Sequence, residues 1–278
     1  MMPQMSDVLR YVAFSDRPDG GNPAGIVLDA SGLSDAEMLA IAADVGYSET
    51  AFVTGKEIRY FSPLAEVPFC GHATVATGVA LAERDGPGEI VFRTQSGPVP
   101  VITRRDDQGR LTATLTSVPP RVVDLAPADL DEILAALRWE AGDLDPSLPP
   151  RVPYAGAWHP VIGAASRERL AELDYDFERL GALMTARDWT TIQLLWREDE
   201  TRFHARNPFP PGGVVEDPAT GAAAAAFGGY LRELGLVEPP ATITILQGED
   251  LGRPSRVLVD IHADRPEIDV TGTAIPIG

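Results

Sequence analysis

The sequence is poor in cysteine and lysine, with one of each, Cys70 and Lys56, in 278 residues. A single cysteine excludes an internal disulfide. It also excludes proton transfer between two facing thiols of one chain, which favours a buried structural role for Cys70. Lys56 lies in a turn-like Thr54-Gly55-Lys56-Glu57 segment. This setting disfavours both a Schiff-base lysine and a Gly-Lys-Ser/Thr phosphate loop.

Long apolar runs are missing as well. The sequence has neither a run of about 18 apolar residues nor a charged-then-apolar leader, so we expect a soluble, cytoplasmic protein with no membrane partner. The formal net charge of −18 disfavours binding to nucleic acids or anionic membranes. A small anionic substrate stays open, because a local group of backbone amides can outweigh a distant surface charge.

An imperfect internal repeat indicates two domains. A chain of this length suits one large domain or two of roughly 100–150 residues. The segment Val67–Thr74 returns in altered form as Val215–Ala222, with Gly71 and Gly221 offset by 150 residues (221 − 71). Two halves that each aim a helix N-terminus at a shared cleft would form a site for a small anion. This arrangement favours an enzyme.

The first domain, residues 1–118, is expected to be strand-rich around one apolar helix. The segment Ser34-Asp35-Ala36-Glu37 has the spacing of a capping box and predicts a helix to about Asp44. The apolar helix is expected over 73–83. The predicted strands are Leu9–Phe14, Ala24–Leu28, Thr50–Val53, Ile58–Ser62, Ile90–Thr94, Val99–Thr103 and Leu111–Thr116.

The second domain, residues 119–266, is expected to repeat this plan after a boundary near 117–121. The proline-rich segment 143–153 is expected to be a loop. A final strand near 268–277, within 267–278, is expected to return to the first domain. Predicted helices are Pro127–Leu137, Arg167–Leu173, Phe177–Thr185 and Ala222–Leu234; predicted strands are Val152–Ala155, Thr191–Trp196, Thr201–Ala205, Thr242–Leu246 and Arg256–Ile261.

Three residues stand out as candidates for catalysis. Glu49 lies between a helix end and an apolar strand, where partial desolvation would raise the pKa of its carboxyl toward the range of a general acid/base. A neutral His72 in the first turn of a helix could donate a hydrogen bond to a substrate. Asp217 precedes a second helix N-terminus. A solvated glutamate, a capping histidine and a capping aspartate remain the alternative interpretations.

A metal site is not expected from the spacing of the ligand-type residues. The segment Cys70-Gly71-His72 offers two ligands at most. The other histidines, His159, His204 and His262, lack the spacing of zinc ligands.

Four motifs resemble the PhzF-like family, which is named for an isomerase of phenazine biosynthesis. They are Gly21–Gly25, Ser48–Phe52, Phe69–Thr74 and Glu216–Gly221, in family order and spread over nearly the whole chain. The resemblance implies an α/β fold like that of diaminopimelate epimerase. Such a fold has two similar halves, each a curved, mostly antiparallel sheet wrapped around a central helix, with the active site between them. It also implies a homodimer and chemistry without metal or organic cofactor.

The resemblance assigns roles to particular residues. Glu49 would be the general acid/base, while His72 and Asp217 would orient the substrate. Backbone amides near Gly71 and Gly221 would hold a substrate carboxylate. The implied substrate-binding residues are Asn22, Ser48, Gly71, Ala73, Thr220, Gly221 and Ala222.

One departure from the family pattern concerns Ala222, which stands where the phenazine isomerase has a serine. The missing hydroxyl argues against the phenazine substrate itself. We therefore expect a cofactor-independent isomerase that moves a proton within a small carboxylate. Two alternatives stay open: an epimerase with Glu49 and Asp217 as paired bases, and a non-catalytic ligand-binding or regulatory protein of the same fold.

Overall fold

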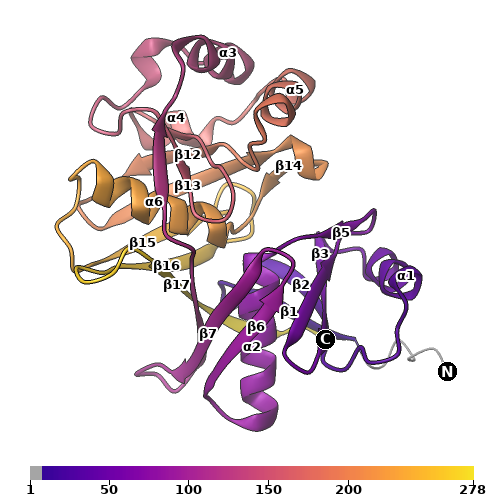
Figure 1. The fold of residues 1–278 in the computed structure, drawn as a ribbon. Coiled ribbons are helices and arrows are strands. Elements are labelled where there is room, and N and C mark those ends of the chain that lie inside the picture. Colours follow the sequence, from indigo (N-terminus) through magenta and orange to yellow (C-terminus); the bar gives the residue numbers. More distant parts are fainter. Residues whose placement is uncertain (1–7) are drawn as a thin grey trace. The chain divides into compact units, whose positions relative to one another are not determined.

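The computed structural model describes residues 8–278, which divide into two compact units. Unit 1 extends to Thr116 and includes Thr271–Gly278, and unit 2 is Ser117–Val270. Strand β17 (Ile268–Pro276) therefore begins in unit 2 and ends in unit 1. Within residues 8–278, every helix is too short or too polar to cross a membrane. In Figure 1 the first part of unit 1, up to Thr116, is indigo to purple, its last segment Thr271–Gly278 is yellow, and unit 2 runs from magenta through orange to yellow.

Unit 1 is a mixed sheet around one central helix. Most neighbouring strands are antiparallel, but β2 (Asn22–Val27) and β3 (Glu49–Thr54) pair in parallel. The other elements are β1 (Leu9–Ala13), α1 (Asp35–Val45), β4 (Glu57–Phe61), β5 (Glu66–Val67), α2 (Gly71–Asp85), β6 (Glu89–Thr94), β7 (Gly97–Arg105) and β8 (Leu111–Thr116).

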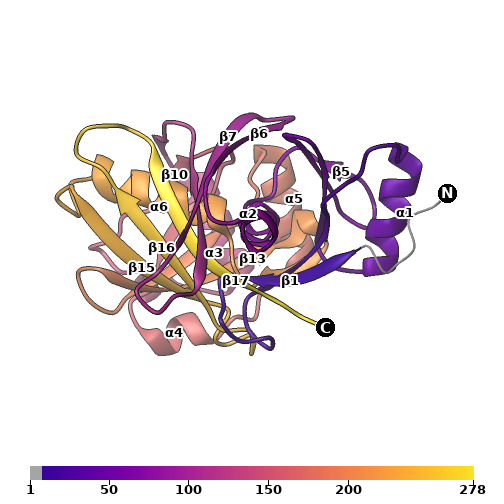
Figure 2. The same cartoon turned by 90° about the horizontal axis from the view of Figure 1, so that it is seen from below.

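The central helix of unit 1 is α2, and it is buried on nearly all sides. Ten of its residues are buried, from His72 to Ala82. Figure 2 looks along its axis, with the strands of unit 1 curving around it. Small residues make this possible: a Cβ on Gly78 would lie 3.0 Å from a methyl of Val101 on β7. The alanines and glycines of the sequence motif thus let the sheet wrap closely around the helix.

Helix α1 begins and ends as its sequence predicts. The Ser34 hydroxyl accepts a hydrogen bond from the Glu37 amide, and the Glu37 carboxylate accepts one from the Ser34 amide at 2.8 Å. The helix stops at Gly46, whose φ of 70° lies in the left-handed region that favours glycine. This end places the short Gly46–Ser48 link directly before β3.

Unit 2 has a second buried central helix, α6 (Gly221–Glu233). A Cβ on Gly228 would lie 2.8 Å from a methyl of Val259. Gly228 therefore lets a strand pack closely against α6, as Gly78 does for α2. The strands of unit 2 are β9 (Arg121–Asp124), β10 (Arg151–Tyr154), β11 (Val161–Gly163), β12 (Gln193–Arg197), β13 (Arg202–Phe209), β14 (Val214–Asp217), β15 (Ala241–Gln247) and β16 (Ser255–Ile261).

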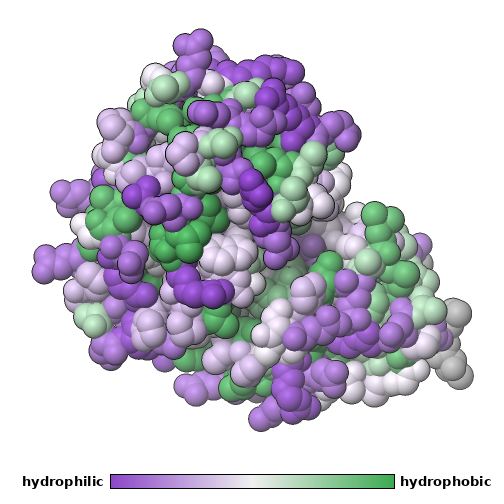
Figure 3. Space-filling model, turned by 45° about the horizontal axis from the view of Figure 1, so that its top comes forward, coloured by the Kyte–Doolittle hydropathy of each residue, from purple (hydrophilic) through white to green (hydrophobic). Residues whose placement is uncertain are grey.

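Three further helices pack on the other face of the unit 2 sheet and enclose a separate apolar core. They are α3 (Pro127–Leu137), α4 (Arg167–Ala171) and α5 (Phe177–Arg187). Ile133, Leu180 and Trp189 belong to this core. On the face drawn in Figure 3, hydrophilic side chains dominate and hydrophobic ones form smaller patches between them.

Some local predictions were wrong. The predicted loop 143–153 includes the first residues of β10, whose Arg151 pairs with Asp124 of β9. Four strands of two to four residues, β5, β9, β11 and β14, were not expected. Strands this short depend on pairing with a neighbouring strand rather than on their own few residues, so local patterns do not indicate them.

Candidate functional site

Three chemically different side chains meet in unit 1. Glu49 opens β3, Cys70 is the N-cap residue of α2, and His72 lies in its first turn. The Cys70 Sγ lies 3.6 Å from the Glu49 Oε2 and 3.3 Å from the His72 Nδ1. The His72 Nε2 lies 3.5 Å from the Glu49 Oε2. A carboxylate, a thiol and an imidazole therefore form one compact cluster.

The imidazole of His72 is held by its neighbours. The Asn22 side-chain amide lies 3.2 Å from Nδ1, and the Ser48 hydroxyl lies 3.5 Å from Nε2. Burial lowers the pKa of His72, while the charge of Glu49 and a hydrogen bond with the Pro23 backbone oppose that shift. The net lowering favours the neutral imidazole, in which one nitrogen donates and the other accepts.

Cys70 is buried, with 7% of its surface exposed. Its carbonyl accepts a hydrogen bond from the Thr74 hydroxyl at 2.6 Å, which in turn lies 2.6 Å from the Tyr60 hydroxyl. This chain fixes the backbone that carries the thiol. The sequence interpretation as a structural cysteine missed the contacts of Cys70 with Glu49 and His72.

The ligand count expected from Cys70-Gly71-His72 needs correction. The sequence indicated two ligands at most, but Glu49, 21 residues earlier, completes a group of three. Their ligand atoms lie within 4.8 Å of one another. The third member was missed because the packing of β3 beside α2 is a non-local contact.

In unit 2, Asp217 ends β14 just before the central helix. The Thr220 hydroxyl donates to the Asp217 Oδ2 at 2.6 Å, and Thr220 is the N-cap residue of α6. The side-chain amide of Gln247, at the end of β15, donates to the Asp217 carbonyl at 2.7 Å and accepts from the Thr220 backbone amide at 3.1 Å. Gln247 thus fixes the turn that carries Asp217, a role that the sequence did not indicate.

The remaining predicted residues lie around the first turns of the two central helices. Gly71 and Ala73 are in α2, and Gly221 and Ala222 are in α6. The structure thus brings Asn22, Ser48, Glu49, Gly71 and His72 together within unit 1. The convergence of this group with Asp217 stays a prediction.

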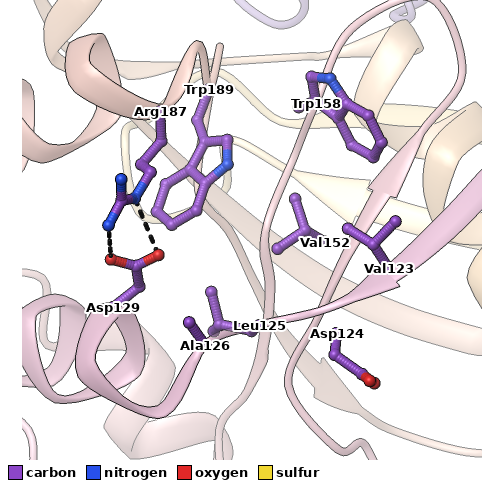
Figure 4. A pocket seen from close by; sticks show the side chains of 9 residues that line it. All are labelled: Val123, Asp124, Leu125, Ala126, Asp129, Val152, Trp158, Arg187 and Trp189. Atoms are coloured by element: carbon purple, nitrogen blue, oxygen red, sulfur yellow. Dashed lines mark hydrogen bonds and ion pairs between the residues drawn. The ribbon is translucent and has the colours of Figure 1, made fainter.

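A cavity of about 180 Å³ in unit 2 lies elsewhere. Figure 4 shows Asp129 and Arg187 joined by two hydrogen bonds, beside Trp189. Trp158 and Val152 line it too. None of the residues singled out by the sequence faces this cavity, and its one carboxylate–guanidinium pair is already satisfied, so it is a weaker candidate for catalysis.

The fold defines the class of protein. A hydroxyproline epimerase from Agrobacterium vitis has a similar structure, with a TM-score of 0.68 and 12% identity, covering 98% of this chain and 89% of that one. A PhzF-family phenazine biosynthesis protein from Bacillus anthracis is closer, with a TM-score of 0.86 and 30% identity, covering 98% and 96%. The chain thus has the mixed α/β, diaminopimelate epimerase-like fold.

The sequence comparisons identify the family. The phenazine biosynthesis-like protein family matches residues 11–278. The "uncharacterized isomerase YfhB" of Bacillus subtilis is 30% identical over 97% of this chain and 96% of its own. The trans-2,3-dihydro-3-hydroxyanthranilate isomerase of Pseudomonas chlororaphis is 31% identical over 96% and 95%. The chain belongs to the PhzF phenazine biosynthesis-like family and is an isomerase.

Proposed function

We propose that this isomerase moves a proton within a small carboxylate substrate, with Glu49 as the general acid/base. The observation that carries the proposal is the cluster in unit 1. The Glu49 carboxylate is 15% exposed and lies beside a buried imidazole that burial keeps neutral. Such a carboxylate can take a proton from an activated carbon and return it at another position.

The neighbours of Glu49 suit this role. A neutral His72 would give up its hydrogen bond to the Pro23 carbonyl in order to donate to a substrate oxygen, and it would not compete for the proton. The amides in the first turns of α2 and α6 would hold the substrate carboxylate, since helix N-termini favour anions and need no reorganisation as charge develops. Asp217 would orient the substrate, and we expect the active protein to be a homodimer.

Two alternatives make different predictions. An epimerase with Glu49 and Asp217 as paired bases would invert one carbon and lose activity when either carboxyl is removed. A non-catalytic ligand-binding protein would bind a carboxylate equally well with Glu49 or with its amide. The proton-shift isomerase needs Glu49 for chemistry and Asp217 for orientation.

The test is hydrogen exchange in heavy water. The probe is trans-2,3-dihydro-3-hydroxyanthranilate, the acid in the name of the Pseudomonas chlororaphis relative. Because Ala222 lacks the serine hydroxyl that would contact this acid, the probe is used at saturating concentration, where wild-type protein should still introduce deuterium at one of its carbons. Glu49→Gln keeps the shape of the side chain but cannot accept a proton, so exchange should fall by roughly 10²–10⁴-fold.

Cys70→Ala is the matched control, because it removes the thiol beside Glu49 but leaves the carboxylate. Exchange should stay within about threefold of wild type, since the chain has no second cysteine and proton transfer between two thiols is therefore excluded. Exchange that survives in Glu49→Gln and vanishes in Cys70→Ala would overturn the mechanism.

Ala222 tests how the substrate is chosen. Ala222→Ser adds the hydroxyl of the phenazine isomerase to the first turn of α6. If the missing hydroxyl limits activity on this probe, the variant should lower the KM by roughly tenfold, the usual worth of one hydrogen bond. An unchanged KM with this probe would mean that the hydroxyl does not explain substrate choice.

A further inference from the structure

The turn that carries Asp217 is held by a side chain from outside it. Gln247, the last residue of β15, is 1% exposed. Its Oε1 accepts a hydrogen bond from the Thr220 backbone amide at 3.1 Å, and its Nε2 donates to the Asp217 carbonyl at 2.7 Å. A backbone amide can only donate and a carbonyl can only accept, so these two partners fix which way the Gln247 side-chain amide faces.

The fixed amide of Gln247 sets the direction of the next hydrogen bonds. Its Nε2 also donates to the Thr220 Oγ1, at 3.0 Å. The Thr220 hydroxyl therefore accepts from Gln247 and uses its own hydrogen to donate to the Asp217 Oδ2 at 2.6 Å. Three side chains thus form a directed chain of hydrogen bonds that runs from Gln247 through Thr220 to the carboxylate of Asp217.

Thr220 is the N-cap residue of α6, but its hydroxyl does not cap the helix. A threonine at this position normally accepts a hydrogen bond from an amide in the first turn of its helix. Within residues 8–278 the Thr220 side chain makes no such bond. Its oxygen accepts from Gln247 instead. The N-cap side chain therefore leaves the first-turn amides of α6 uncovered.

We propose that Gln247 is a positioning residue that keeps the Thr220 hydroxyl on Asp217 and off the first turn of α6. This inference rests on the proposed function, in which those amides hold the substrate carboxylate. Without the Gln247 donor, the Thr220 oxygen would accept from a first-turn amide, as N-cap threonines ordinarily do. That bond would compete with the carboxylate for the same donor. The effect therefore falls on substrate binding rather than on the proton transfer assigned to Glu49.

Ser255 provides a matched control in the same place. It lies directly opposite Gln247 in the antiparallel pair β15–β16 and is 4% exposed. Its hydroxyl donates to the Pro218 carbonyl at 2.9 Å, so it supports the same turn. That bond reaches only the backbone of the turn, and its removal leaves the bond between Gln247 and the Thr220 hydroxyl in place.

The first measurement is deuterium exchange into trans-2,3-dihydro-3-hydroxyanthranilate, analysed as KM and kcat. Gln247→Met keeps a side chain of similar size but removes both hydrogen-bonding groups. Its KM should rise by roughly tenfold, the usual worth of one hydrogen bond, while kcat stays within about threefold of wild type. Ser255→Ala should leave both constants close to those of wild type. A purely structural role for Gln247 would not separate KM from kcat, and equal KM values in wild type and Gln247→Met would overturn the proposal.

A double-mutant cycle tests whether Gln247 acts through the Thr220 hydroxyl. Thr220→Val removes the hydroxyl and keeps the shape of the side chain. No hydroxyl can then cap the helix, so in this background Gln247→Met should raise the KM by less than about twofold further. In a Thr220→Ser background, which retains the hydroxyl, Gln247→Met should again raise the KM by roughly tenfold. A full rise in the Thr220→Val background would contradict the proposal.

Crystal structures of the free wild type and of Gln247→Met separate this inference from the proposed function, because they need no substrate. In the variant the Thr220 Oγ1 should lie within hydrogen-bond distance of the Ala222 or Ala223 amide nitrogen. A hydroxyl that stays away from the helix overturns the inference. If it moves onto the helix while Glu49→Gln exchanges deuterium normally, the role of Gln247 in the turn stands and the proposed function falls.

A second variant covers the case in which Gln247→Met does not fold, which circular dichroism and the thermal transition show. Gln247→Glu keeps an acceptor for the Thr220 amide but loses the donor to the Thr220 hydroxyl. The same rise in KM and the same movement of the hydroxyl are expected. Wild-type values for both would overturn the proposal.

Discussion

The two units have different side chains at corresponding positions beside their central helices. In unit 1 the parallel pair β2–β3 places Ala24, after Pro23, beside Glu49. In unit 2 the parallel pair β11–β12 places Val161, after Pro160, beside Gln193. Gln193 therefore holds the position of Glu49.

The residues at the start of the central helices differ in the same way: those of α2 can ionise and those of α6 cannot. The 150-residue offset of the glycines (221 − 71) matches Cys70 to Thr220 and His72 to Ala222. All three groups of the unit 1 cluster can ionise, and none of their counterparts in unit 2, Gln193, Thr220 and Ala222, can. Gln193 is fully buried, and within residues 8–278 its side-chain amide atoms have no hydrogen-bond partner. The three ionisable side chains of the cluster thus have no counterparts of the same chemistry in unit 2, and the role proposed for Asp217 does not follow from this correspondence.

The largest expected effect concerns two matched ion pairs, one before each central helix. Glu216 and Arg206 are paired in unit 2, with side chains 2% and 10% exposed. Glu66 and Arg59 are paired in unit 1, with side chains 21% and 25% exposed. Glu216→Gln leaves a buried guanidinium without its carboxylate, so the free energy of unfolding should fall by about 3–5 kcal/mol.

Glu66→Gln is the matched variant in unit 1. Arg59 keeps a second carboxylate partner, Asp35 at 2.7 Å, and is partly exposed. Loss of the Glu66 carboxylate should therefore lower the free energy of unfolding by about 1 kcal/mol. Urea unfolding of both variants measures the difference, and equal costs would show that burial does not distinguish the two pairs.

A smaller effect concerns the pH dependence of stability that comes from the buried His159 of unit 2. Burial lowers the pKa of His159 from 6.5 to about 3. Below pH 6.5 the unfolded chain binds a proton that the folded protein does not bind, so stability falls as pH falls toward 3. Between pH 7 and pH 5 this group should cost about 2 kcal/mol.

His159→Gln should remove that share of the pH dependence. The measurement is urea unfolding of wild type and variant at about pH 7 and pH 5, where the gap between the two proteins should narrow by about 2 kcal/mol at the lower pH. A gap that is independent of pH would mean that the folded and unfolded protein bind this proton equally, so that burial does not lower the pKa of His159.

The smallest expected effect concerns the stability contributed by Gln193. Its buried side-chain amide lacks hydrogen-bond partners within residues 8–278, so Gln193→Met replaces an unsatisfied polar group by an apolar one of similar size. The free energy of unfolding should stay the same or rise by up to about 1–2 kcal/mol. A fall of that size in thermal or urea unfolding would show that the amide has a partner that stabilises the fold.

Much of the secondary structure could be predicted because its signals are local. The helix Pro127–Leu137 has the predicted bounds, because a proline at the first helical position already has a helical φ and needs no partner for an amide hydrogen. The capping box at Ser34 gave the start of α1 correctly. Short strands such as β14 were missed, because their stability comes from pairing with β13 rather than from their own residues.

The candidate site could be predicted only in part. The motifs identified Glu49, His72 and Asp217, but not which other groups touch them. The contact of Cys70 with Glu49 depends on how β3 packs against α2. Gln247, which supports Asp217 from 30 residues away, lies in a strand with no motif.

Deuterium exchange in Glu49→Gln and Gln193→Met tests most directly whether the acid/base chemistry belongs to unit 1. These residues hold corresponding positions in the two units. We predict that exchange into trans-2,3-dihydro-3-hydroxyanthranilate falls by roughly 10²–10⁴-fold in Glu49→Gln and stays within about threefold of wild type in Gln193→Met. Equal losses in the two variants, or a larger loss in Gln193→Met, would contradict the assignment of the acid/base chemistry to unit 1.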